Sequence, residues 1–167
     1  MHHEYVERVV NLIKPDSHRI YNMSVQEAEQ RILSGDPNGV EGIDGSFALL
    51  AKEGKTVRMA RSMDRPMLYF LAKREEGPAL IVAERMDAIS EWLQGEGLGD
   101  QFHPSYTRMV PAHYVVEILL IGCPDPDPVY TRYFDPQKNT QPNDLDTIGA
   151  RYIWALAEEI QKWISSL

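Results

Sequence analysis

Short apolar runs joined by tight, glycine-containing turns occupy the middle of the chain, and few folds accept that spacing. Two pairs of such runs are present: 46–51 with 56–60, and 67–72 with 79–83. Turns that contain glycine, between apolar runs of strand length, are typical of β-hairpins. Further β-like runs follow at 112–121 and 129–134. Because strands joined by hairpins run antiparallel, we expect an antiparallel sheet of hairpin-connected strands.

Helical periodicity flanks these strands. A first helix is predicted from apolar residues at helical spacing that end before a proline: Val6, Val9, Val10, Ile13 and Pro15. A second is predicted from Ser24 to Gly35, with Glu27 completing a capping box, and a shorter one over 86–93. The cluster 36–39 between them predicts a turn. Helices that flank strands, rather than alternate with them, indicate an α+β fold.

The C-terminal segment predicts a separate amphipathic helix. Residues 135–144 are polar and contain proline and asparagine, so a surface linker is expected there. One apolar stripe follows at helical spacing: Leu145, Ile148, Tyr152, Leu156, Ile160 and Trp163. We therefore expect a domain over 1–143 and a helix over 144–167. Tyr152, Trp154 and Trp163 are candidate docking residues, although the helix could equally cover the domain's own core.

Charge and composition exclude some classes of function. The chain has 17 Lys+Arg against 25 Asp+Glu, a formal net charge of -8, which disfavours binding to nucleic acid. No apolar run reaches the roughly 20 residues that span a bilayer, and the first residues do not resemble a signal peptide. Cys123 is the single cysteine and fits a reducing compartment. A cytoplasmic protein that binds neither nucleic acid nor a membrane is expected.

Six segments, in order, carry a resemblance to one family. They are 42–49 (GIDGSFAL), 57–61 (VRMAR), 65–70 (RPMLYF), 81–89 (IVAERMDAI), 110–114 (VPAHY) and 130–136 (YTRYFDP). This series is similar to the second half of the class II (N-terminal nucleophile) glutamine amidotransferase domain of the asparagine synthetase and β-lactam synthetase family. The resemblance implies a truncated Ntn-hydrolase-like fold. It also implies that the closing helix corresponds to the start of an ATP-pyrophosphatase domain.

The residues that hydrolyse glutamine in that family have no counterpart here. The family uses a cysteine at the mature N-terminus, whereas this chain has His at position 2 and its thiol at Cys123. The glutamine-binding elements of the family precede the Gly-x-Phe-Ala strand, for which the 41 residues before Gly42 leave too little room. Asn38-Gly39 only superficially matches the oxyanion donor. We therefore predict no catalytic residues, with the two N-terminal helices replacing the lost half.

Charged residues near neighbouring strand ends form the candidate binding site. They are Arg58, Arg61, Asp64, Arg65, Glu84 and Arg85. They could bind an anion or a partner, or form an exposed ion-pair network. In the family, the surface around these loops faces the synthetase domain. His103 and His113 match no metal motif and Cys123 is interpreted as a small apolar filler, so neither a metal nor a cofactor is predicted.

The leading functional hypothesis is a non-catalytic, asparagine-synthetase-like subunit. It would dock to an ATP-pyrophosphatase-type amide ligase chain, or to a second copy of itself, and shape that partner. One alternative is part of an active two-chain or longer glutamine-dependent amide ligase. Another is a domain that senses a small molecule through the arginine-lined edge.

Overall fold

The structure is a computed structural model that describes residues 6–121, 127–138 and 140–167. The chain divides into two units, Met1–Phe134 and Asp135–Leu167. The polar segment after Phe134 therefore belongs with the C-terminal helix. The two units are described separately.

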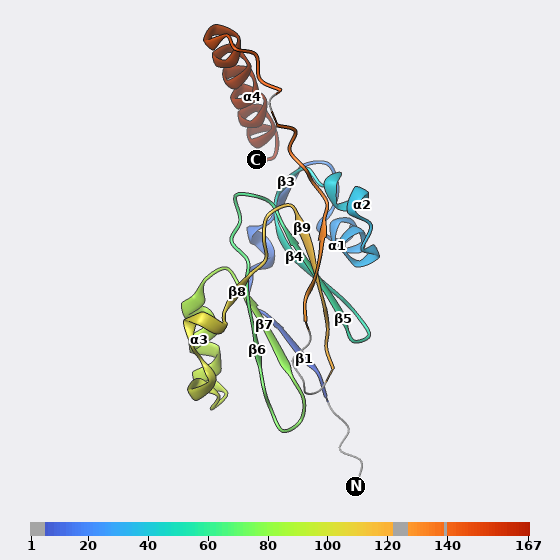
Figure 1. Cartoon of the computed structure of the whole chain (residues 1–167), viewed down its shortest axis with the longest axis vertical. Helices are drawn as coiled ribbons and strands as arrows, with labels where there is room; N and C mark the ends of the chain where they lie inside the picture. Colours follow the sequence, from blue (N-terminus) through green and yellow to red (C-terminus); the bar gives the residue numbers. More distant parts are fainter. Residues whose placement is uncertain (1–5, 122–126, 139) are drawn as a thin grey trace. The chain divides into compact units, whose positions relative to one another are not determined.

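The first unit contains two four-stranded sheets (Figure 1). One has the order β1-β7-β6-β8, formed by Arg8–Asn11, Ala79–Ala83, Leu68–Ala72 and Arg108–Met109. The other has the order β10-β9-β5-β4, formed by Val129–Arg132, Tyr114–Leu119, Thr56–Arg61 and Ala48–Glu53. A two-stranded sheet pairs β2 (Arg19–Ile20) with β3 (Gly45–Ser46). The predicted hairpins 46–60 and 67–83 are confirmed as β4–β5 and β6–β7.

Helices cover the outer faces of both large sheets. In Figure 1, α1 (Val25–Ser34) and α2 (Pro37–Glu41) lie beside β4, whereas α3 (Met86–Gly95) lies beside β6 and β7. Three short 3-10 turns complete the unit: η1 (Pro15–Ser17), η2 (Gly99–Gln101) and η3 (Pro104–Tyr106). Separate hydrophobic clusters fill the space between the sheets and the space under each helical layer. The unit is therefore an α+β body of four layers.

Alternation along each strand produces these clusters. On β5, Val57 and Met59 face the other sheet, while Ala60 packs under α1. Successive strand residues point to opposite faces, so a strand between two packed layers must be apolar on both. All five residues of β7 are buried for this reason.

Local capping explains where α1 begins and ends. The Ser24 hydroxyl accepts a hydrogen bond from the Glu27 N–H at 3.1 Å, as the capping box predicts. The Glu27 carboxylate pairs with Arg31 at 2.9 Å instead of returning to Ser24, so half of the box forms. Gly35 ends the helix with φ 70°, a left-handed conformation that glycine adopts without strain.

The predicted first helix is wrong, because this segment is strand β1. It pairs in parallel with β7, so the sheets are not wholly antiparallel. Val9 and Ile13 face the core between the sheets, and Val10 and Leu12 face α3. An apolar run buried on both faces has no clean period of two, so its spacing also fits a helix. Of the two N-terminal helices expected to cover a sheet face, only the second is present, as α1, and the short helix α2 lies in the same layer.

The predicted turn at 36–39 is also wrong. Asp36 caps α2, its side chain accepting a hydrogen bond from the Asn38 N–H at 3.1 Å. Pro37 occupies the first helical position, where its missing N–H has no cost. The Asp-Pro pair, which is also common in turns, therefore starts a short helix here. Val40 of that helix is buried in the hydrophobic cluster between the helices and the sheet.

The second unit contains one long helix, α4 (Leu145–Ser165), as predicted. It begins at Asp144, whose carboxylate accepts a hydrogen bond from the Thr147 N–H at 3.0 Å. None of its residues is buried. The helix therefore presents its apolar stripe without a covering layer from its own unit.

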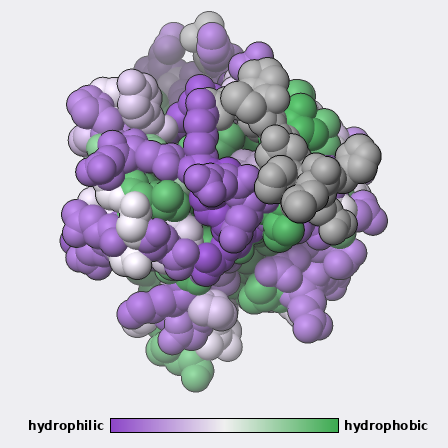
Figure 2. All heavy atoms as spheres, turned by 90° about the horizontal axis from the view of Figure 1, so that it is seen from below, coloured by the Kyte–Doolittle hydropathy of each residue, from purple (hydrophilic) through white to green (hydrophobic). Residues whose placement is uncertain are grey.

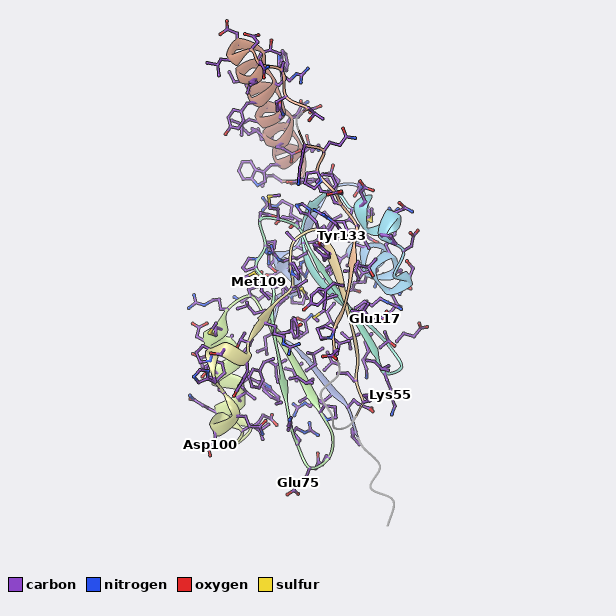
Figure 3. All side chains as sticks on the ribbon, in the orientation of Figure 1. Lys55, Glu75, Asp100, Met109, Glu117 and Tyr133 are labelled. Atoms are coloured by element: carbon purple, nitrogen blue, oxygen red, sulfur yellow. The ribbon has the colours of Figure 1, made fainter. Side chains whose placement is uncertain are left out.

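Polar residues dominate the face of the molecule in Figure 2, where hydrophobic residues form small patches between them. The tips of the two main hairpins carry charge, with Lys55 and Glu75 labelled in Figure 3. Among the described residues, no helix combines the length and apolar character needed to cross a membrane.

Replacing Ile13 tests whether the N-terminal segment is part of the core. Ile13 is 4% exposed between the sheets, so Ile13→Ala should lower the free energy of unfolding by about 2–5 kcal/mol. Val6 is 57% exposed, and Val6→Ala should change it by less than about 0.5 kcal/mol. Urea unfolding of the full chain measures both. Equal, small effects of the two substitutions would contradict the placement of β1.

Candidate functional site

The six charged residues of the predicted site do not form one cluster. Arg58 lies on the helix-facing side of β5, where its Nε pairs with Glu117 at 2.6 Å. Its Nη1 also donates to the carbonyl oxygen of Leu33 near the end of α1. Glu117 is labelled on β9 in Figure 3. Arg58 therefore links two strands to a helix, and its charge is used in the fold.

Arg65 and Glu84 do come together. The Arg65 guanidinium pairs with the Glu84 carboxylate and donates to the carbonyl and hydroxyl oxygens of Ser17 in η1. The neighbouring His18 imidazole is partly buried, and this burial, followed by the charge of Arg65, lowers its pKa. This group connects the loop before β6 to the end of β7 and to η1.

Arg85 points to a different partner. It precedes α3 and pairs with Asp87 in the first turn of that helix, with Nε–Oδ1 at 2.9 Å. Its side chain is 77% exposed. An exposed pair of this kind contributes little to stability.

Arg61 is the buried member of the set. Its Nε donates to the carbonyl oxygen of Val110 at 2.6 Å, and Nη2 lies 3.7 Å from the sulfur of Met109. Its Nη1 donates to three carbonyl oxygens of the loop after β5: those of Ser62, Met63 and Arg65. The carbonyl oxygen of Arg61 itself accepts a hydrogen bond from the Tyr133 hydroxyl at 2.8 Å; Met109 and Tyr133 are labelled in Figure 3.

Asp64 closes the same loop against β3. Its two carboxylate oxygens accept hydrogen bonds from the hydroxyls of Ser46 and Ser62. Partial burial raises the pKa of Asp64, but these hydrogen bonds and the charge of Arg65 outweigh it, so the pKa lies below its ordinary value. Asp64 is therefore a carboxylate that shapes the loop between the two sheets.

The histidines form no joint site. His103 lies at the start of η3, where its Nδ1 accepts a hydrogen bond from the Ser105 N–H at 3.2 Å. His113 has φ 68° in the turn before β9 and packs against Phe134, with ring centroids 4.9 Å apart. Among the described residues, no three His, Cys, Asp or Glu side chains gather where a metal ion could bind. Asn38 is exposed in α2, and Cys123 lies outside the described residues.

The first unit contains a pocket that the sequence did not indicate. It has a volume of about 430 Å³ and lies beside β6, β8 and η3. Its lining combines polar and apolar residues: Tyr69, Phe70, Leu71, Lys73, Gln101, Ser105, Tyr106, Arg108, Ile118 and Pro128. Lys73 and Arg108 are far apart in sequence, and no motif joins them. Only the pairing of β8 with β6 brings them to one edge.

The candidate docking residues of α4 are all accessible. Tyr152 is 70%, Trp154 is 75% and Trp163 is 44% exposed. Tyr152 and Trp163 share the apolar stripe, whereas Trp154 lies on the opposite side of the helix by its spacing. The helix therefore offers aromatic side chains on two faces.

Removal of the Arg61 guanidinium should destabilise the fold. Arg61→Met would leave the carbonyl groups of Val110 and of the following loop without donors, at a cost of about 2–3 kcal/mol in the free energy of unfolding. Arg85→Met is the matched control at an exposed position, with an expected change below about 0.5 kcal/mol. Chemical denaturation measures both. A tolerated Arg61→Met would show that these hydrogen bonds are dispensable.

The Asp64 carboxylate should give a pH-dependent contribution to stability. A carboxylate whose pKa is lower in the folded state stabilises the protein above its unfolded-state pKa, and that stability is lost as the pH falls through the folded-state value. Asp64→Asn should therefore reduce stability at neutral pH, by less than about 1 kcal/mol because the carboxylate is largely accessible to water, which screens its interactions. The difference in stability between the original protein and Asp64→Asn should become smaller below pH 3.8, the ordinary pKa of an aspartate. Urea unfolding across this range, with Asp100→Asn as control, tests this; a constant difference would contradict it.

Comparison with known proteins adds no relative. No protein-family model matches the chain, and searches of curated proteins and of solved structures found no match.

Proposed function

We propose that the chain is a non-catalytic, asparagine-synthetase-like domain that docks through α4 to an ATP-pyrophosphatase-type amide ligase. The observation that carries this proposal is the 21-residue helix α4, in which no residue is buried. Supporting observations come from the motifs and from the charged residues of the first unit.

The first four family-like segments lie on consecutive structural elements. Segment 42–49 covers β3 and the start of β4, 57–61 lies in β5, 65–70 leads into β6, and 81–89 covers the end of β7 and the start of α3. Gly45, the glycine of the first segment, has φ 139°, and a Cβ there would lie 2.2 Å from the Arg19 carbonyl oxygen. That motif glycine is therefore a packing requirement of the β2–β3 pair, which is consistent with a shared fold.

The charged residues support a structural role over a catalytic one. Arg58, Arg61 and Arg65 are engaged by carboxylates or backbone carbonyls of the first unit. A side chain that already makes several hydrogen bonds would have to break them to bind a substrate. Exposed apolar side chains at helical spacing run along α4, which makes that helix a candidate docking element.

Docking to a partner protein would remove the apolar stripe of α4 from water. The exposed apolar residues on its main stripe include Leu145, Tyr152, Leu156, Ile160 and Trp163. An amphipathic helix of this kind commonly inserts its apolar face into a groove of a partner. In the family that the sequence resembles, a helix at this position leads into the ligase domain, so the ligase is the partner that we propose.

Affinity capture with the full chain, read by mass spectrometry, tests the docking. We expect stoichiometric recovery of a protein with the Ser-Gly-Gly-x-Asp phosphate loop of ATP pyrophosphatases. Leu156→Glu places a charge in the centre of the stripe and should reduce that recovery roughly tenfold or more. Arg151→Gln changes the net charge by the same amount on the polar face and should leave recovery unchanged.

Two results would contradict this function. One is recovery of the chain alone, in which case sedimentation would show whether a second copy occupies α4. The other is equal recovery of the ligase by Leu156→Glu and Arg151→Gln, because α4 would then not be the docking element.

A further inference from the structure

The edge of strand β6 has a gap in its hydrogen-bond ladder. The register of β6 with β8 pairs Leu68 with Met109 and Tyr69 with Arg108, and the Val110 N–H donates to the Met67 carbonyl oxygen at 2.9 Å. In an antiparallel ladder, the backbone groups of alternate residues point to the same side. Residues 67, 69, 71 and 73 therefore turn their N–H and C=O groups toward the β8 side.

β8 ends before it reaches Leu71. By register, the residue opposite Leu71 would be Tyr106, but Tyr106 belongs to η3 and its N–H bonds to the His103 carbonyl oxygen at 2.9 Å. Beyond Leu71, the side-chain amide of Gln101 makes the two hydrogen bonds to Lys73 that a neighbouring strand would otherwise make. Its oxygen accepts from the Lys73 N–H at 2.8 Å and its nitrogen donates to the Lys73 carbonyl at 2.7 Å.

Leu71 thus lies between Tyr69 and Lys73, whose backbone groups on this side already have hydrogen-bond partners. No described strand pairs with it on this side. Its N–H and C=O form a donor–acceptor pair at the wall of the 430 Å³ pocket, which Leu71 lines. An exposed pair of this kind is a template for an amide group of a ligand. Asp100 and Met109, labelled in Figure 3, mark η2 and β8 on either side of the gap.

Arg108 places a positive charge at the pocket of an acidic chain. Lys73 and Arg108 line it, and none of its described lining residues is a carboxylate, whereas the whole chain has a formal charge of -8. The Arg108 guanidinium interacts with the Tyr69 hydroxyl, which lies 3.4 Å from the hydroxyl of Tyr130. Both partners are uncharged hydroxyls, and within the described part of the chain no carboxylate is paired with this guanidinium. A guanidinium in this setting favours a carboxylate.

The rest of the wall is apolar. Phe70, Leu71, Ile118 and Pro128 contribute to it, with the exposed ring of Tyr106 at the margin. A volume of this size matches the range of small-ligand pockets. A ligand that fits all three features has a carboxylate, an amide beside it and an apolar group.

We infer that this pocket binds a small organic carboxylate with an adjacent amide and an apolar side chain, as in an N-acylated amino acid. The carboxylate pairs with Arg108 near Lys73, the amide completes the ladder at Leu71, and the apolar group lies against Ile118 and Tyr106. The C-terminal residue of a peptide carries the same chemistry. The inference is independent of the docking function of α4.

NMR titration of the full chain with matched probes tests this inference. N-acetyl-L-phenylalanine has the carboxylate and the amide, N-acetyl-L-phenylalaninamide lacks the charge, and 3-phenylpropionate lacks the amide. We expect saturable shifts from the first probe, with the Leu71 amide among the most affected. Each of the other two should bind roughly tenfold more weakly, since each loses one set of hydrogen bonds. N-acetyl-dialanyl-phenylalanine separates the two sources, because tighter binding than the single residue indicates a peptide terminus.

Two substitutions at exposed positions locate the binding site. Arg108→Gln should weaken binding of N-acetyl-L-phenylalanine roughly tenfold, because a charge-assisted hydrogen bond is lost. Arg85→Gln removes the same charge outside the pocket and should leave binding unchanged. Equal affinity for the acid and its neutral amide, an unchanged affinity in Arg108→Gln, or no saturable shift from any probe would each overturn the inference.

Discussion

The guanidinium of Arg61 holds the two sheets and their connection in one arrangement. Arg61 is the one charged residue among those described that is buried. It extends from β5 of one sheet to the Val110 carbonyl beside β8 of the other, and to the loop that joins β5 to β6. Burial of a charge without a carboxylate is costly unless hydrogen bonds replace its water. Four backbone carbonyls do so here, and those carbonyls in turn depend on the arginine.

This use of arginine in the fold separates the charged residues into two kinds. Arg58, Arg61 and Arg65 form ion pairs and hydrogen bonds that join neighbouring elements of the first unit. Their charges are therefore used in the fold. Arg108, by contrast, lines the pocket together with Lys73, and it lies on the short strand β8, whose early end leaves the Leu71 backbone open. Pro104 and the η3 turn that it begins are the reason that β8 is short. The pocket therefore results from the early end of the pairing between β8 and β6, and not from a sequence motif.

Features with local signals could be predicted from the sequence. The β4–β5 turn at Gly54, the Ser24 cap of α1 and the Asp144 start of α4 depend on neighbouring residues and were found where the sequence places them. Features that depend on distant partners were not predicted. β1 is a strand because β7 lies beside it, and the roles of Arg61 and Arg108 depend on the contacts of β8. The division of the strands into two facing sheets is likewise a matter of packing, which periodicity within one strand does not encode.

A domain of this kind is proposed to shape a ligase without hydrolysing glutamine itself. Ammonia release from glutamine by the purified full chain tests that claim most directly, with Cys123→Ala as the matched variant because Cys123 is the single thiol. We expect the two proteins to release ammonia at the same background rate. Release above that background by the unmodified chain, abolished in Cys123→Ala, would contradict it and would make the chain a glutaminase.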